Sequence, residues 1–159
     1  MPHIHELNDF TTSAFILHPS EPKILLLKHR KIGKWLQPGG HIELDENPLQ
    51  ALHHELEEET GLKPTDYKII AQPDRPNLSG AVTELPIPFY FNQHNYNATH
   101  KHIDLCYLAK AKTDVLTDSP DGADDIKWLS LEEIKQKHTN GDVFDETLAV
   151  CQWIFDRYY

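Results

Sequence analysis

A glycine-rich loop that leads into an acidic amphipathic helix is the feature of this sequence that most restricts its fold. The loop ends at Gly39 and Gly40, and the helix is predicted over residues 48–60. Pro48 suits an early helical position, where its missing N–H has no partner to lose, and Gly61 is typical of the position just beyond a helix C-terminus. Leucines at helical spacing give the helix one apolar side, which has to pack against a core.

Three carboxylates, those of Glu55, Glu58 and Glu59, fall within one turn of this helix and share a face. Like charges at this spacing weaken a helix by roughly 0.2–0.5 kcal/mol per pair. A solvated acidic face is the common interpretation of a glutamate run. A metal site is the other, because hard oxygen ligands suit Mg²⁺ or Mn²⁺, and a cation would relieve the repulsion. The apolar side and the preceding glycine loop favour the metal site.

The segment from Gly40 to Leu62 resembles the signature box of the MutT-like Nudix hydrolases. In that box a glycine is followed by a glutamate, an Arg-Glu pair, two further glutamates, a glycine and an aliphatic residue at fixed spacing. Glu46 stands at the first glutamate position, and every later fixed position agrees except one. His54 stands where the family has its arginine, directly before Glu55. The preceding Trp-Leu-Gln-Pro-Gly-Gly run is similar to the family's usual lead-in to the box.

This resemblance implies an α/β/α sandwich with a mixed sheet, and hydrolysis of a nucleoside diphosphate-linked substrate at its pyrophosphate. The substrate would be a nucleoside triphosphate or a nucleotide sugar. The resemblance assigns Mg²⁺ or Mn²⁺ to Glu55, Glu58, Glu59 and the backbone carbonyl of Gly39. It assigns Glu46 to the support of the loop and of the metal's outer waters. The base that deprotonates the attacking water would be Glu55, Glu58 or an acid from a downstream loop.

His54 departs from the family pattern and leaves two interpretations open. An imidazole is shorter than a guanidinium, and it is neutral near pH 7 unless the neighbouring acids raise its pKa. In the first interpretation His54 still hydrogen-bonds a glutamate and serves the catalytic group formed with Glu55 and Glu58. In the second the active site is weakened or lost, and the chain is a non-catalytic metabolite-binding Nudix domain.

A second polar cluster comprises His100, His102 and Asp104, which project to one face of a predicted strand. A subset of Nudix proteins carries a similar stretch, so these side chains are predicted to line the substrate cleft. The exposed edge of a half-buried strand is the alternative. A second metal site fits this spacing poorly without a further ligand.

Arg30 lies at the end of a predicted strand, beside the box loop. Arg30 and Gly40 are predicted to contact the substrate, because a guanidinium can bind phosphate through two hydrogen bonds. The acids from Asp121 to Asp125 either supply a ligand or base or form a solvated turn. Some of the aromatic side chains are candidates for stacking on a base or for core packing. These are Phe89, Tyr90 and Tyr96.

The remaining elements are read from apolar periodicity and turn residues. Strands are predicted over residues 10–17 and 23–28 (a hairpin), 41–44, 67–71, 88–92, 103–109 and 126–129. Ser130 and Glu133 form a capping-box pattern that begins a helix, and residues 146–159 are predicted to form an amphipathic helix over the sheet. The stretch 72–88 is predicted to be loop and edge strand. This order predicts one mixed α/β domain over residues 1–159.

Composition excludes several classes of function. The formal net charge of -10 disfavours binding to long nucleic acid, although a small nucleotide remains possible because local cations or bound metal can reverse the local field. No apolar run is long enough for a membrane helix, and the N-terminus does not resemble a signal peptide. Cys106 and Cys151 lie in apolar segments, which indicates core residues of a protein in a reducing compartment, the cytoplasm. The same positions disfavour an isomerase of isopentenyl diphosphate, because that activity needs a dedicated cysteine. A homodimer is compatible with the family.

Overall fold

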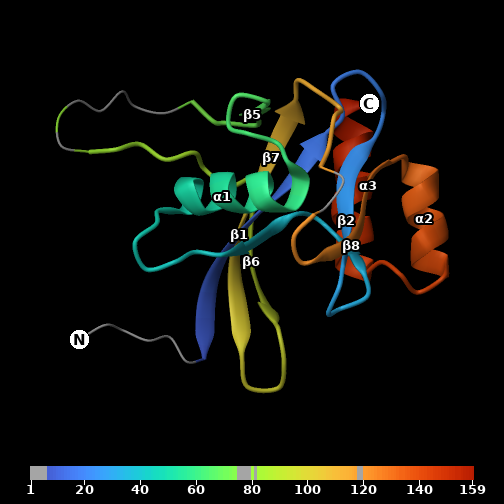
Figure 1. The fold of residues 1–159 in the computed structure, drawn as a ribbon, viewed down its shortest axis with the longest axis horizontal. Coiled ribbons are helices and arrows are strands. Elements are labelled where there is room, and N and C mark those ends of the chain that lie inside the picture. Colours follow the sequence, from blue (N-terminus) through green and yellow to red (C-terminus); the bar gives the residue numbers. More distant parts are fainter. Residues whose placement is uncertain (1–6, 75–79, 81, 118–119) are drawn as a thin grey trace.

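The computed structural model describes residues 7–74, 80, 82–117 and 120–159. Within these residues eight strands form one mixed sheet, accompanied by three helices (Figure 1). The centre of the sheet is the parallel pair of β1 (Asn8–Leu17) and β7 (Lys101–Ala111), in register from Asn8↔Lys101 to Leu17↔Lys110. All other strand pairs are antiparallel. The prediction of a mixed sheet is therefore confirmed.

The main path of the sheet has the order β3-β2-β1-β7-β5, while β4 also pairs with β1, β6 with β7 and β8 with β2. The other strands are β2 (Ile24–His29), β3 (Trp35–Leu36), β4 (Gly39–His41), β5 (Tyr67–Ile69), β6 (Tyr90–Asn95) and β8 (Ala123–Leu129). The helices are α1 (Pro48–Thr60), α2 (Leu131–Thr139) and α3 (Asp145–Tyr158). The predicted hairpin is present, since Ile16 pairs with Leu25 and Leu17 with Ile24.

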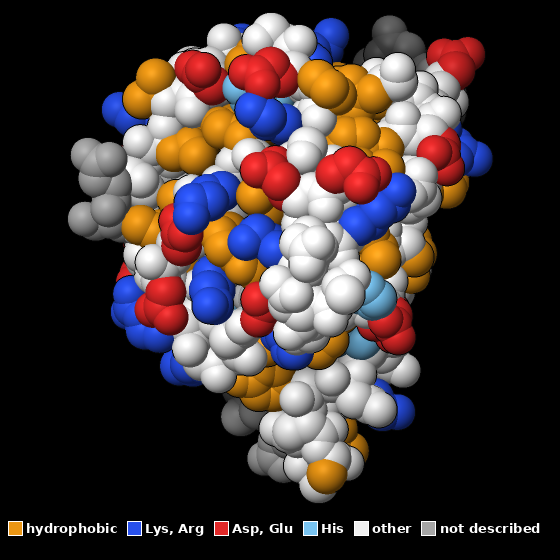
Figure 2. Space-filling model, turned by 90° about the vertical axis from the view of Figure 1, so that its right-hand side faces the viewer, with side chains coloured by type: hydrophobic (Ala, Val, Ile, Leu, Met, Phe, Trp, Pro, Cys, Tyr) orange, Lys and Arg blue, Asp and Glu red, His pale blue; other side chains and the backbone are white. Residues whose placement is uncertain are grey.

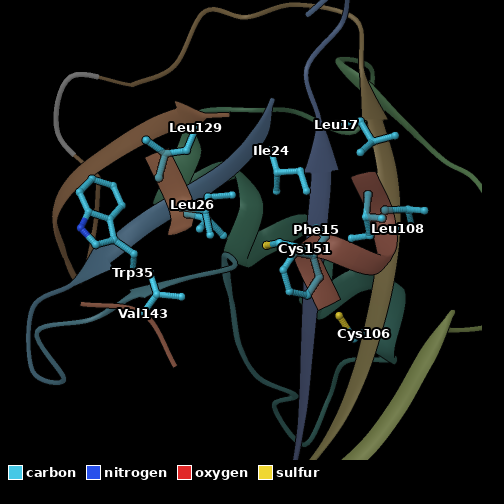
Figure 3. Close-up of a cluster of buried hydrophobic side chains, with 12 residues drawn as sticks. Phe15, Leu17, Ile24, Leu26, Trp35, Cys106, Leu108, Leu129, Val143 and Cys151 are labelled. Atoms are coloured by element: carbon cyan, nitrogen blue, oxygen red, sulfur yellow. The ribbon is translucent and has the colours of Figure 1, made fainter. Parts of the chain in front are cut away.

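Helices cover both faces of the sheet. On one face, Leu52 and Leu56 of α1 pack in a cluster that includes Ala14 and Ile16 of β1. On the other face, Phe15 of β1 belongs to a cluster that Cys151 and Ile154 of α3 complete (Figure 3). Alternate residues of β1 therefore face opposite layers, as strand geometry requires. This arrangement confirms the predicted α/β/α sandwich.

Helix α1 begins and ends where the sequence predicts. The Asn47 side chain accepts hydrogen bonds from the backbone N–H groups of Leu49 and Gln50, and the Asn47 backbone N–H donates to the Gln50 side-chain oxygen. These contacts satisfy N–H groups that have no partner within the helix. Gly61 ends the helix with φ 79°, a left-handed conformation that suits glycine.

Several predicted boundaries were wrong. The extended segment expected over residues 41–44 is instead β4 at Gly39–His41, because its pairing with β1 involves both glycines. The loop expected around Trp35–Leu36 is β3, which pairs with β2. The edge strand expected within 72–88 is not found among the described residues of that stretch; residues 75–79 and 81 lie outside them.

The predictions about the N-terminal segment fall on residues 1–6, which lie outside the described residues. In the parts of the chain that the structure describes, every helix is too short or too polar to cross a bilayer. On the face of the molecule shown in Figure 2, Lys and Arg side chains lie among Asp and Glu side chains and form no continuous basic stripe.

Candidate active site

The three box glutamates lie at different depths on α1. Glu59 is buried, Glu55 is half-buried and Glu58 is exposed. The helix is held against the sheet by Leu52 and Leu56, so the turn that carries the glutamates faces the strand β4. The sequence predicts that these three acids share one face of the helix, and the structure buries Glu59 while it leaves Glu58 exposed.

The two glycines of β4 let the backbone approach these carboxylates closely. The Gly39 N–H donates to Glu59 Oε2 at 2.8 Å. A Cβ atom at Gly40 would lie 2.1 Å from Glu55 Oε1, so a side chain at this position would displace the carboxylate. The glycine loop and the acidic helix, identified separately in the sequence, therefore form a single site.

Burial and mutual repulsion leave the negative charge of this site poorly compensated. Burial, together with the charges of Glu55, Asp121 and Glu58, raises the pKa of Glu59 to about 8, while the hydrogen bond from the Gly39 N–H acts in the opposite direction. Burial also raises the pKa of Glu55 above its ordinary value, against the lowering effect of His54. A cation at this position would stabilise the ionised form of both carboxylates.

His54 bridges two glutamates of the box. Its Nδ1 lies 3.1 Å from Glu46 Oε1 and its Nε2 lies 3.1 Å from Glu58 Oε1. Hydrogen bonds to Glu58 and Glu46 raise the pKa of His54, which favours the imidazolium, the form in which both ring nitrogens donate. The expectation that His54 would still hydrogen-bond a glutamate is confirmed.

A loop at the start of β8 lies against the same turn of α1. The Asp121 N–H donates to the Glu58 carbonyl at 3.3 Å, and an added Cβ at Gly122 would lie 3.9 Å from Glu59 Oε1. The sequence offered this acidic loop as a candidate only, since nothing local in it shows that it meets the helix. Asp121 is thus a further acid beside the box.

Arg30 holds this loop in place. Its Nε donates to Asp124 Oδ1 at 3.1 Å and its Nη2 donates to the Ala123 carbonyl at 2.8 Å. The predicted contact between Arg30 and a substrate phosphate therefore stays a prediction, and in this structure the guanidinium contacts the loop.

The donor chemistry of the box suits a hard divalent cation, since Glu55, Glu58 and Glu59 all offer carboxylate oxygens. The glutamates are not drawn together, however. Among the described residues, the ligand atoms of one group of three His, Cys, Asp or Glu side chains lie within 4.8 Å of one another, and that group contains no glutamate. Glu58 contacts His54 through Oε1 and Glu59 accepts from Gly39 through Oε2, so each carboxylate keeps its other oxygen for a cation.

The second polar cluster lies on the opposite face of the sheet. His102 and Asp104 alternate along β7 with residues that face α1, and they share the side of Cys106, which packs in the α3 cluster. Asp104 is buried and accepts hydrogen bonds from Thr11 Oγ1 at 3.0 Å and Ser13 Oγ at 2.7 Å. The structure does not bring these residues to the glutamates, and their predicted contact with substrate stays a prediction.

Neither cysteine offers a reactive thiolate. Cys106 and Cys151 are buried, and burial raises the pKa of both thiols, that of Cys151 to about 12. The structural role expected for both residues is consistent with their burial, and a cysteine-dependent isomerase has no support at either position.

The NUDIX domain family model matches residues 9–148. The chain therefore belongs to the Nudix family, and the sequence resemblance is confirmed. The crystal structure of a NUDIX-family hydrolase from Clostridium perfringens is similar, with 29% identity and a TM-score of 0.77; the alignment covers 93% of this chain and 96% of that one.

Two curated relatives match over shorter segments. A probable DHNTP pyrophosphohydrolase of Lactococcus lactis is 32% identical over 100 residues, which span 63% of this chain and 54% of the relative. An RNA pyrophosphohydrolase of Francisella tularensis is 36% identical over 58 residues, which span 36% of this chain and 37% of the relative. The matched segments thus span about half or less of these relatives.

Proposed function

We propose that this chain is a Nudix pyrophosphohydrolase that cleaves the diphosphate linkage of a small nucleotide with the help of Mg²⁺ or Mn²⁺. The nucleotide is a nucleoside triphosphate or a nucleotide sugar. The names of the two curated relatives support a phosphorus anhydride as the bond that is cleaved. The two names refer to different substrates, so they do not specify the base or the second substituent of the nucleotide.

The observation that carries this proposal is the concentration of carboxylates between α1 and β4. Glu55 and Glu59 both have a raised pKa, and the acids of the site have one nearby cationic group, His54, among the contacts described. Such a site is costly to the fold unless a cation uses it. Divalent metal bound here would polarise the phosphoryl oxygens and lower the pKa of the attacking water.

The chain's own residues would orient the reaction. The Gly39 N–H fixes the buried Glu59 carboxylate through Oε2, and His54 fixes Glu58. Among the described residues no hydrogen-bond donor fixes the Glu55 carboxylate, which leaves its oxygen atoms available to accept a proton. As water adds to one phosphorus and the bridging P–O bond breaks, the water's proton would pass to a Glu55 carboxylate oxygen.

The test is product release from a panel of nucleoside triphosphates, nucleotide sugars and dinucleoside polyphosphates, with Mg²⁺ or Mn²⁺. Wild type is compared with Glu58→Gln and with a matched control, Glu57→Gln, an exposed glutamate at the neighbouring helix position. We expect one substrate class to be turned over. Glu58→Gln should lower kcat/KM by at least about 100-fold, since even indirect partners of metal ligands are worth about 10–100-fold, whereas Glu57→Gln should change little.

Equal losses in both variants would contradict the assignment of the box glutamates. No turnover of any substrate, by wild type or by His54→Arg, would overturn the hydrolase and support a metabolite-binding domain without catalysis. In that outcome, a nucleotide from the panel should still bind in excess Mg²⁺, as measured by calorimetry.

A further inference from the structure

Three imidazoles meet on the face of the sheet opposite α1, near the N-terminal ends of β1 and β7. His41 ends β4, His100 immediately precedes β7, and His102 lies within β7. Their ligand atoms all lie within 4.8 Å of one another. His41 is the additional ligand that the spacing of His100 and His102 alone does not provide.

The register of the sheet explains why these residues meet. β1 lies between β4 and β7, with Thr11 opposite His41 and Asp9 opposite His102. Figure 1 shows this end of β1 and β7 projecting beyond the helices. The meeting point depends on the pairing of three strands from distant parts of the chain, so it is a property of the assembled sheet.

Asp9 adds an oxygen atom to the same place. Its Oδ2 lies 3.1 Å from His100 Nε2 and 3.7 Å from His41 Nε2. A carboxylate beside two imidazole nitrogens can serve either as their hydrogen-bond partner or, with an ion present, as a fourth ligand.

The side chain of His102 provides a second, independent observation that points to a ligand. Its Nε2 atom is buried and has no hydrogen-bond partner in the structure, while its ring stacks on Tyr96 with 4.8 Å between centroids. A buried polar atom without a partner destabilises the fold, because it has lost its hydrogen bonds to water without gaining others. A bound cation would provide the missing partner for this nitrogen lone pair.

We propose that His41, His100 and His102, with Asp9 as the fourth ligand, form a binding site for one Zn²⁺ ion. Imidazole nitrogen suits Zn²⁺ and disfavours Mg²⁺, whose preferred ligands are oxygen atoms. Tetrahedral Zn²⁺ with bonds of about 2.0–2.1 Å needs ligand atoms roughly 3.3 Å apart. The ligand atoms of the three histidines already lie within 4.8 Å of one another, so small rotations of the side chains bring them to that spacing. The His41 side chain is exposed and therefore has room to rotate.

This site is distinct from the carboxylate site, although one strand borders both. Along β4, Gly40 faces Glu55 on the α1 side, and the next residue, His41, points to the other face. An ion held by His41 would tie β4 to β7 across β1. It would thereby fix the strand whose glycines contact Glu55 and Glu59.

The test is a Zn²⁺ titration of the metal-free full-length chain in excess Mg²⁺, with a chromophoric chelator as competitor. We expect one Zn²⁺ per chain for wild type and for Glu58→Gln, because the ligands are nitrogens away from the box. His41→Ala, at an exposed position, and His102→Gln should each weaken Zn²⁺ binding by at least about 10-fold. His138→Ala is the control, since His138 lies beside Asp145 between α2 and α3.

Thermal unfolding gives a second measurement that does not depend on catalysis. Zn²⁺ should raise the Tm of wild type and of His138→Ala, and at the same Zn²⁺ concentration it should raise the Tm of His41→Ala by clearly less. The proposal is overturned if wild type binds no stoichiometric Zn²⁺. It is equally overturned if Zn²⁺ binding survives both histidine variants or is lost in Glu58→Gln.

Discussion

At the scale of single residues, His54 shows how an unusual substitution can keep the geometry of a site. The imidazole offers two donors at fixed positions, and the structure uses one for Glu46 and the other for Glu58. A guanidinium would offer more donors over a longer reach. His54 is therefore a positioning residue, and its task depends on both nitrogens carrying a proton.

We expect His54→Ala to lower kcat/KM by about 10–100-fold and to weaken the apparent affinity for Mg²⁺, since it frees the Glu58 carboxylate. His54→Arg should restore most of the activity. Activity against Mg²⁺ concentration measures both effects, with His138→Ala as the control. Full activity in His54→Ala, or no rescue by arginine, would contradict a positioning role.

Gly40 is a second residue whose importance depends on a single close contact. We expect Gly40→Ala to lower kcat strongly and stability little, because its methyl group would meet the movable end of Glu55. Gly33→Ala should do the reverse, since Gly33 has open space around it but φ +70°. Urea unfolding and kcat, measured on both variants, check this; unchanged turnover in Gly40→Ala would show that the Glu55 carboxylate need not lie there.

At the scale of elements, α1 and α2 are both fixed by capping boxes of the same kind. Asn47 and Gln50 begin α1, and Ser130 and Glu133 begin α2. The cap of α1 directly follows Glu46, which contacts His54, whereas the cap of α2 has no contact with the box among those described. A comparison of variants at the two caps can therefore distinguish an effect on stability from an effect on activity.

Asn47→Ala and Ser130→Ala should each lower the free energy of unfolding by about 1 kcal/mol. Only Asn47→Ala should also lower kcat/KM, because the loop that carries Glu46 loses its anchor. Denaturant titration and steady-state kinetics on the two variants make the comparison. Equal kinetics in both would show that the cap of α1 serves stability alone.

Elements with strong local signals were the ones that the sequence could predict. Helix α1 has its polar cap, its leucines at helical spacing and Gly61, all within one segment. In contrast, β4 contains Gly39 and Gly40, which disfavour strand formation by themselves, and the partner strand β1 imposes its extended shape. β3 was missed for a related reason, because its two residues are extended through their pairing with β2.

At the scale of the whole molecule, the sheet decides which residues meet. The sequence identified the glutamates of the box as neighbours because helical spacing alone brings them together. It could not place Asp121 beside them, nor join His41 to His102, because these contacts depend on the pairing of strands far apart in the chain. Long-range register is not encoded in any local pattern.

The parallel pairing of β1 with β7 has a consequence for how this chain must be made. Its partners lie 93 residues apart in sequence, so closing that loop costs roughly 4 kcal/mol of chain entropy before the pair contributes anything. On a ribosome that adds about 5–20 residues per second, β1 emerges roughly 5–20 s before β7. During that interval β1 can pair with β2 at Ile16 and Leu17 and with β4 from Thr11 to Ser13, but the edge that later pairs with β7 stays open. The strand at the centre of the finished sheet thus waits with one edge unpaired until most of the chain has been synthesised.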